Sequence, residues 1–148
     1  MKISFKATYG IVAALDLAMH NGAVPVQAKS IAHRQAIPLR FLEQVLLAMK
    51  QAGLVDSARG AQGGYRLSRL PKEISLAQIV ETLDGSLSSM SRPRSSARRP
   101  GLASESLLGE IWERVRQAEL SVLSSVTLQD LTERYRQLDQ ERTLMYHI

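Results

Sequence analysis

A short glycine-rich segment between two apolar runs places the strongest constraint on the fold. Residues 54–68 read LVDSARGAQGGYRLS, which predicts two short strands joined by a tight loop with Arg59 at its tip. Gly60, Gly63 and Gly64 lack a Cβ atom, so the backbone can take positive φ there, reverse direction and lie close against a bulky partner. A phosphate-binding loop would need a Gly-Lys-Ser/Thr ending and a following helix, and this segment has neither. A solvent-exposed hairpin without a ligand stays open as an alternative.

Two short helices are predicted immediately before this hairpin, over residues 26–36 and 38–52. Pro38 separates them, because proline disrupts a helix interior but is favoured in a first turn. Gly53 stands where the second helix ends and the hairpin begins. The second helix has apolar residues at i, i+3, i+4 and i+7, which predict one buried face: Leu39, Phe41, Leu42, Val45, Leu46 and Met49. Helix, turn, helix and hairpin in this order are typical of a winged helix-turn-helix.

The polar face of the second helix carries Arg40, Glu43 and Gln44, which are able to reach base edges in a major groove. An arginine donates to guanine, a glutamate accepts from cytosine N4, and a glutamine pairs with adenine. Each pairing contributes about 1–3 kcal/mol of discrimination against a wrong base. Glu43 as a surface carboxylate without a partner is the alternative that the residue types leave open.

Several segments resemble the Rrf2 family of bacterial transcription regulators. They are MKISFKATYG at the start of the chain, LRFLEQVL in the second helix, GLV and RGAQGGY in the hairpin, and ISLAQIVE after it, with a weaker similarity around Trp112. The resemblance implies that Arg40, Glu43 and Gln44 face the major groove and that Arg59 enters a minor groove. It also implies phosphate contacts at the start of the first helix, from Lys6, Thr8 and Tyr9.

Composition agrees with a small nucleic-acid-binding protein. A chain of 148 residues that is 45% apolar buries one modest core, and a net charge of +5 with a pI near 9.9 favours a polyanionic partner. No run of eighteen apolar residues and no signal-peptide core occurs, so we expect a cytoplasmic protein without a membrane partner. The sequence predicts a mainly α fold with a small β-hairpin wing: a winged helix-turn-helix DNA-binding domain over 1–85, a flexible Ser/Arg-rich loop over 86–104, and a dimerisation helix with a C-terminal helix over 105–148.

The loop contains four arginines, which either add nonspecific phosphate contacts or form a solvated charge run: Arg92, Arg94, Arg98 and Arg99. Beyond it a long amphipathic helix carries an apolar stripe formed by Leu108, Ile111, Val115, Ala118 and Val122, with Trp112 beside it. We expect this stripe to pack against the same helix of a second subunit, and an intramolecular third layer is the alternative. Thr127 and Asp130 predict the start of a last helix that continues to about Gln140, after which the chain frays.

A two-fold dimer presents two recognition helices to two half-sites. The expected function is therefore a homodimeric, sequence-specific DNA-binding transcription regulator that acts as a repressor on a pseudo-palindromic operator. A protein-interaction module that uses the same fold only for docking is the alternative. An enzyme is not expected, because no nucleophile, acid–base pair or cofactor loop converges in the sequence.

The chain has no cysteine. Many members of the resembled family hold an iron–sulfur cluster through three cysteines before the dimer helix. Here Ser106 stands at the last of these positions, and Gly109 stands where some members have a histidine. A serine hydroxyl is a poor iron ligand compared with a thiolate, so no cofactor is expected.

The histidines His20, His33 and His147 show no metal-ligand spacing, so no metal is expected either. Either the protein senses its signal through a sensor protein or a small ligand, or not at all, or serines within 86–106 replace native cysteines.

Overall fold

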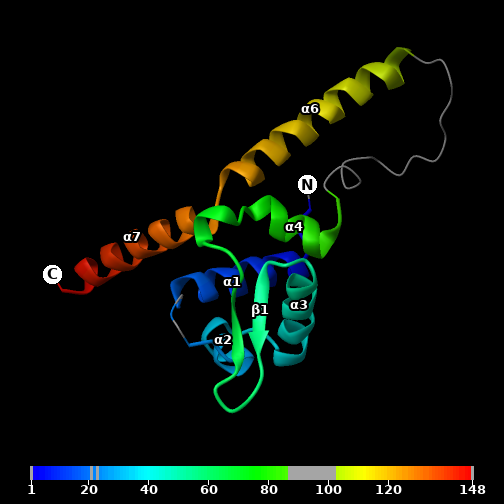
Figure 1. The fold of residues 1–148 in the computed structure, drawn as a ribbon. Coiled ribbons are helices and arrows are strands. Elements are labelled where there is room, and N and C mark those ends of the chain that lie inside the picture. The colour runs from blue at the N-terminus through cyan, green and yellow to red at the C-terminus, as the bar shows by residue number, and fades with distance from the viewer. Residues whose placement is uncertain (1, 21, 23, 87–102, 148) are drawn as a thin grey trace.

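The computed structural model describes residues 2–20, 22, 24–86 and 103–147. Figure 1 shows a group of short helices with a hairpin, from which two long helices extend in different directions. In chain order the elements are α1 (Phe5–Met19), α2 (Ala28–Gln35), α3 (Leu39–Gln51), β1 (Val55–Ala58), β2 (Gly64–Leu67), the 3₁₀ turn η1 (Pro71–Glu73), α4 (Leu76–Asp84), α6 (Ala103–Ser125) and α7 (Leu128–Tyr146). The predicted mainly helical fold with a small antiparallel hairpin is confirmed.

Local signals determine where α3 begins and ends. Pro38 is its N-cap and separates it from α2, as predicted. Gly53, at φ +78°, follows the last turn of α3, and its amide donates to the carbonyl of Lys50. The next amide, that of Leu54, donates to the carbonyl of Met49. These two bonds form a Schellman motif, which satisfies the final carbonyls of the helix and turns the chain into β1.

Hydroxyl side chains cap three other helices. Ser4 is the N-cap of α1. Ser75 caps α4 by accepting from the Gln78 amide, while the Gln78 side chain accepts from the Ser75 amide. Thr127 and Asp130 form the same reciprocal pair at the start of α7, so the capping predicted there is confirmed.

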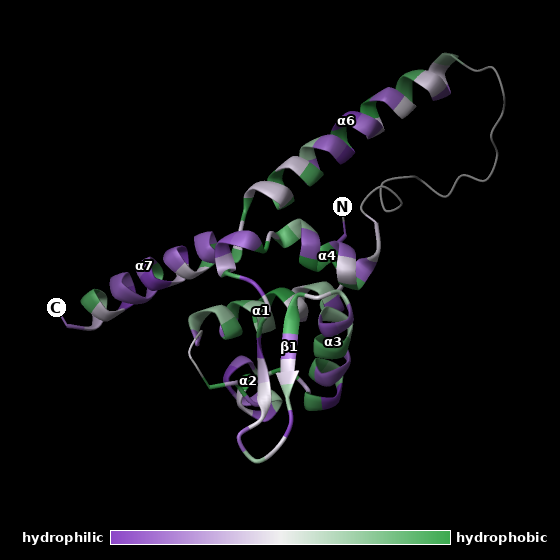
Figure 2. Ribbon diagram, in the orientation of Figure 1, coloured by the Kyte–Doolittle hydropathy of each residue, from purple (hydrophilic) through white to green (hydrophobic). Residues whose placement is uncertain are grey.

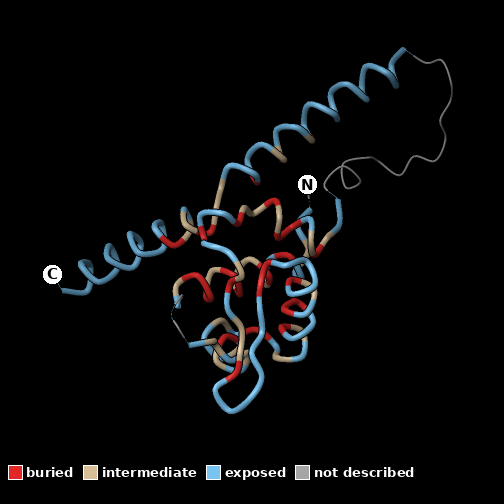
Figure 3. Tube along the Cα trace, viewed as in Figure 1, coloured by how far each residue is buried: buried red, intermediate tan, exposed pale blue. Residues whose placement is uncertain are grey.

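The core forms around α1, which contacts α2, α3, α4 and α7. Small residues on its buried face let these neighbours approach closely: Ala7, Gly10, Ala13 and Ala14. A Cβ atom added at Gly10 would lie 2.1 Å from Cδ1 of Leu83, so α4 packs directly onto the α1 backbone. Figure 2 shows α1 mostly in hydrophobic green and α4 in mixed green and purple, and Figure 3 shows the buried segments concentrated in this part of the molecule.

The hairpin is anchored by a third short strand contact. β1 pairs with β2 in the antiparallel register Val55 with Leu67. Tyr65 on β2 also forms an isolated bridge with Val26, through amide–carbonyl bonds of 2.8 and 2.7 Å in the two directions. The segment before α2 therefore holds the hairpin against the helices. Residue 26, which was predicted to start the helix, is instead part of this bridge, and α2 begins at Ala28.

The two long helices differ from the rest of the fold in their exposure. Leu123 is the buried residue of α6, and α7 buries only Leu128 and Thr132 near its start. An intramolecular third layer along the whole of α6 is therefore wrong, because its contacts with α4 lie at its C-terminal end (Figures 1 and 3).

Two predicted boundaries were also wrong. The last helix does not fray near Gln140 but continues to Tyr146. α6 begins at Ala103, inside the segment predicted as loop. Residues 87–102 of that loop, which include its four arginines, lie outside the described residues.

Candidate nucleic-acid interface

The outward face of α3 carries the side chains that the sequence singled out. Arg40, Glu43 and Gln44 are all exposed. The opposite face of α3 is buried against α1 and α4 through Leu42, Val45, Leu46 and Met49. Because these buried residues hold the helix at fixed rotation, the three polar side chains point away from the protein interior.

The hairpin tip lies at the same end of the molecule as the start of α3. α3 ends where β1 begins, and β1 runs back along the helix to the loop that contains Arg59 (Figure 1). Arg59 is exposed at this loop. The first turns of α3 and Arg59 at the hairpin tip are therefore exposed at one end of the molecule.

The three loop glycines have different structural roles. Gly60 takes φ +109° and has open space around it. Gly64 takes φ +153°, and a Cβ atom there would lie 2.4 Å from the carbonyl oxygen of Val26. Gly63 does not use the positive φ that a glycine allows. It is buried, and a Cβ atom there would lie 2.3 Å from the Ala58 carbonyl oxygen. Gly63 and Gly64 thus allow close packing of the hairpin itself.

The start of α1 is joined to the start of α3 by aromatic packing. The Tyr9 ring meets the Phe41 ring edge-on, with centroids 5.4 Å apart, so Tyr9 is half-buried. Lys6 is exposed one turn earlier. The Thr8 hydroxyl is exposed but donates to the Ser4 carbonyl at 3.1 Å. Of the three predicted phosphate contacts, Lys6 is the charged one and is exposed, while the Tyr9 ring packs against Phe41 of the recognition helix.

A buried carboxylate that sequence reasoning missed links α1 to α2. Asp16 has no exposed surface, and its two oxygens accept from Arg34 at 3.0 and 2.7 Å and from Gln35 at 2.9 Å. Burial by itself would raise the pKa of Asp16, but these hydrogen bonds and the Arg34 charge outweigh it, and the pKa lies below its usual range. His20 caps α1 and is 3.5 Å from the same carboxylate. The only sequence signal was an aspartate inside an apolar run.

A second carboxylate joins the two ends of the winged-helix unit, by which we mean residues 2–20, 22 and 24–86. Asp84, at the end of α4, accepts from the amide of Ser4 at 3.1 Å and from the Ser4 hydroxyl. The two residues are 80 positions apart in the chain. This contact fixes the start of α1, where Lys6 lies.

The apolar stripe of α6 is largely uncovered. Its four large residues and the neighbouring Trp112 are between 41% and 62% exposed: Leu108, Ile111, Trp112, Val115 and Val122. Large apolar side chains in a contiguous exposed row mark an interaction surface. The stripe is the candidate dimer interface that the sequence predicted.

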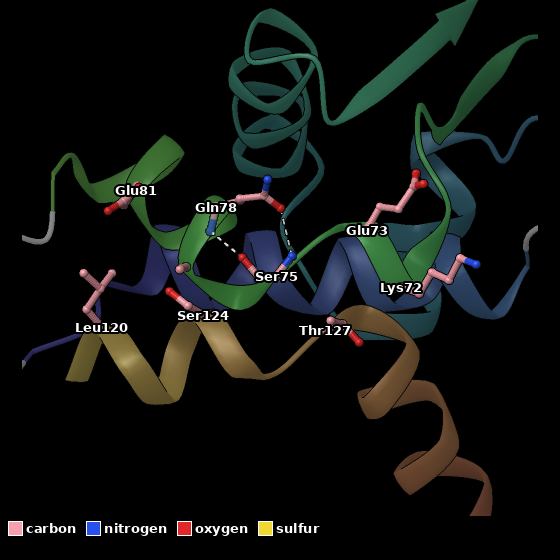
Figure 4. Close-up of a pocket in the computed structure, with 9 residues that line it drawn as sticks. Lys72, Glu73, Ser75, Gln78, Glu81, Leu120, Ser124 and Thr127 are labelled. Carbon is pink, nitrogen blue, oxygen red and sulfur yellow. Dashed lines mark hydrogen bonds between the residues drawn. The ribbon is translucent and has the colours of Figure 1, made fainter. Parts of the chain in front are cut away.

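A cleft of about 350 Å³ lies where α6 meets α4. Figure 4 shows Ser75 and Gln78 hydrogen-bonded to each other at the start of α4, with Leu120 and Ser124 of α6 on the other side. The polar atoms of Ser75 and Gln78 in those bonds are engaged in capping α4. This cleft is away from the exposed face of α3.

The described part of the chain contains no group of three His, Asp or Glu residues arranged to hold a metal ion. Within the same residues, no helix is both long and apolar enough to span a bilayer.

The sequence profile of the Rrf2 family, described as iron-dependent transcriptional regulators, matches residues 3–134. The residues present do not fit an iron–sulfur centre held by thiolates, because the chain has no cysteine. Ser106 and Gly109 are exposed on α6, and Gly109 offers no side chain.

Two regulators illustrate the similarity. The HTH-type transcriptional regulator CymR of Bacillus subtilis is 36% identical over 148 residues, covering 99% of each chain. Its solved structure, described as the global cysteine regulator, has a TM-score of 0.77 and covers 90% of this chain and 98% of that one. The structure of T. potens IscR is 37% identical with a TM-score of 0.73, covering 91% and 88%. With its winged-helix unit and exposed α3 face, the chain belongs to the Rrf2 family of DNA-binding transcription regulators, a family without enzymatic activity.

Proposed function

We propose that the protein is a homodimeric repressor that binds a pseudo-palindromic operator through two copies of α3 and the wing. The observation that carries this proposal is the exposure of Arg40, Glu43 and Gln44 at the same end of the molecule as Arg59. A helix can read bases in a groove only if its polar side chains point to the outside of the protein. In α3 the apolar face is buried and the polar face is exposed, as this role requires.

The proposed roles follow from groove chemistry. Glu43 accepts from cytosine N4, Arg40 donates to guanine, and Gln44 pairs with adenine. Arg59 enters the adjacent minor groove, where a narrow groove concentrates negative potential. Gly60, with its open surroundings, lets the loop approach the DNA backbone.

Contacts with phosphates position the reading helix without carrying sequence information. Lys6 supplies a charged contact at the start of α1. Tyr9 offers a hydroxyl next to the recognition helix, because its ring already packs on Phe41. Thr8 contacts a phosphate as a donor only by giving up its bond to the Ser4 carbonyl.

The proposed dimer forms through the stripe of α6. Leu108, Ile111, Val115, Ala118 and Val122 are spaced 3, 4, 3 and 4 residues apart, which is the spacing of helix pairs that interlock side chains. A two-fold axis at this seam places the two α3 helices on half-sites separated by a whole number of helical turns.

A dimer that covers both half-sites blocks other proteins from them, which supports repression. We infer that it acts in the cytoplasm, where a bacterial chromosome lies. Because the chain has no thiolate, a sensor protein or a small ligand would carry any signal.

The test compares DNA binding by the full chain and by Arg59→Ala. A genomic footprint supplies the operator, and fluorescence anisotropy measures affinity from low to high salt. We expect Arg59→Ala to lose at least tenfold in affinity and to show a weaker salt dependence. Arg142→Ala is the matched control, since that arginine is exposed on the far part of α7.

A protein-interaction module would behave differently. Equal affinity of Arg59→Ala and Arg142→Ala, or no retention of duplex DNA at low salt by the unaltered chain, contradicts the proposal.

A further inference from the structure

The exposed face of α3 contains one large apolar residue. Its exposed positions form a single row along the helix: Arg40, Glu43, Gln44, Leu47, Lys50 and Gln51. All are polar or charged except Leu47, which is 53% exposed. Leu47 lies at the centre of this row, four residues after Glu43 and three after Gln44.

The fold does not explain a leucine at this position. The core side of α3 is supplied by its buried residues, and Leu47 is not among the half-buried apolar residues that pack against the core. A polar residue would serve equally well on a solvated helix face. The position therefore calls for an account outside the monomer's own packing.

The position of Leu47 relative to the proposed reading residues provides that account. Residues at i+3 and i+4 lie on the same side of a helix, and each residue rises 1.5 Å along the axis. From Arg40 to Leu47 the row extends about 10 Å, which fits within a major groove about 12 Å wide. Leu47 then lies over base edges, flanked on both sides by polar side chains.

We propose that Leu47 selects thymine at one position of each half-site by contacting its 5-methyl group. This inference rests on the proposed function and adds one base to it. The thymine methyl is the apolar group displayed in the major groove, and cytosine lacks it. A phosphate is a poor partner for this side chain, because burying its oxygens against a leucine removes water without supplying a hydrogen bond.

The experiment removes the methyl groups one at a time. Each thymine of the operator is replaced by deoxyuridine, which keeps the base pair and loses only the 5-methyl. Affinity is measured for the unaltered chain and for Leu47→Ala. Leu144→Ala is the matched control, because Leu144 is a 67% exposed leucine on the far part of α7.

We expect one thymine in each half-site to be sensitive. Its replacement weakens binding by the unaltered chain about fourfold per half-site, which is the change in affinity expected when one buried carbon group is removed. Leu47→Ala binds the two DNAs equally, whereas Leu144→Ala retains the fourfold difference. Circular dichroism of Leu47→Ala shows an unchanged fold, since the side chain is outside the core.

Several outcomes overturn the inference. The inference about Leu47 fails, while the proposed function stands, if the operator is bound specifically but no deoxyuridine replacement lowers the affinity. It fails in the same way if one replacement lowers the affinity equally for the unaltered chain and for Leu47→Ala. A change in the sedimentation of Leu47→Ala with unchanged deoxyuridine sensitivity assigns the residue to a protein contact instead. If the unaltered chain retains no duplex DNA, the proposed function and this inference fall together.

Discussion

The winged-helix unit and the two C-terminal helices differ in how completely each buries its apolar side chains. Residues 5–84 supply nearly all of the core, whereas α6 and α7 together bury only three residues. Helices in proteins gain most of their stability from tertiary packing of an apolar face. The exposed row of leucine, isoleucine and tryptophan on α6 has no such packing within the monomer. The winged-helix unit thus buries its own apolar side chains, whereas the exposed row on α6 is the surface through which we propose that a second copy binds.

Charge separates the same two parts. Residues 1–86 contain ten Lys and Arg against six Asp and Glu, while residues 103–147 contain five against eight. The basic unit carries the proposed DNA contacts, and the acidic helices extend away from it (Figure 1). A polyanion therefore attracts one end of the molecule more strongly than the other, which favours binding through the winged-helix unit.

The largest effect is expected from a charge in the α6 stripe. Ile111→Glu places a carboxylate in the proposed seam, so the dimer dissociates and each monomer binds one half-site. Losing the linked second contact lowers operator affinity about a thousandfold. Sedimentation and anisotropy measure the two effects. A full-strength dimer would refute the seam.

Ser106→Glu is the control for that change. Ser106 is exposed on the same helix but lies about 140° around the axis from Ile111. We expect dimerisation and affinity to be unchanged. The temperature at which the winged-helix unit unfolds should be unchanged in Ile111→Glu, because that unit has its own core.

The second effect concerns the hairpin. Gly64→Ala forces a Cβ atom against the Val26 carbonyl, whereas Gly60→Ala meets nothing within 4 Å and strains only its φ. We expect the first change to reduce the free energy of unfolding by about 3 kcal/mol and the second by about 1 kcal/mol. Urea denaturation checks the order. Equal losses would show that positive φ, rather than contact with residue 26, controls the position.

A third change affects the link between α1 and α2. Asp16→Asn removes the charge that accepts from Arg34 and Gln35, and we expect about 2 kcal/mol less stability. This value is below that of a fully buried ion pair because Arg34 is 36% exposed. Asp56→Asn, on the exposed hairpin, serves as the control with little change. Dimerisation through α6 should be unaffected by either variant.

The smallest effect is a pH dependence of stability. The pKa of Asp16 is lowered in the folded protein, so its contribution is fully present above the unfolded pKa, near 3.9, and is lost as pH falls through the folded pKa. The difference in free energy of unfolding between the unaltered chain and Asp16→Asn should therefore shrink as pH is lowered from 7 to 3. A constant difference over this range would contradict the role of ionised Asp16.

Sequence reasoning recovered the elements that depend on near neighbours. Pro38, Gly53 and Thr127 act within a few residues, and the period of α3 identified which of its faces is exposed. The last helix was placed too short because the final residues were expected to fray, whereas the helix continues to Tyr146. The bridge of Val26 with Tyr65 was missed because strand pairing depends on a distant segment.

The sequence by itself determined where α3 begins and ends and which of its side chains meet the surroundings. Only the tertiary structure decided that Asp16 is a buried link, that Ser4 is held by Asp84, and that Gly64 is required by a backbone contact. The physical reason is range: caps and helical periodicity act over about four residues. Buried carboxylates and close backbone contacts join residues that only the folded chain brings together.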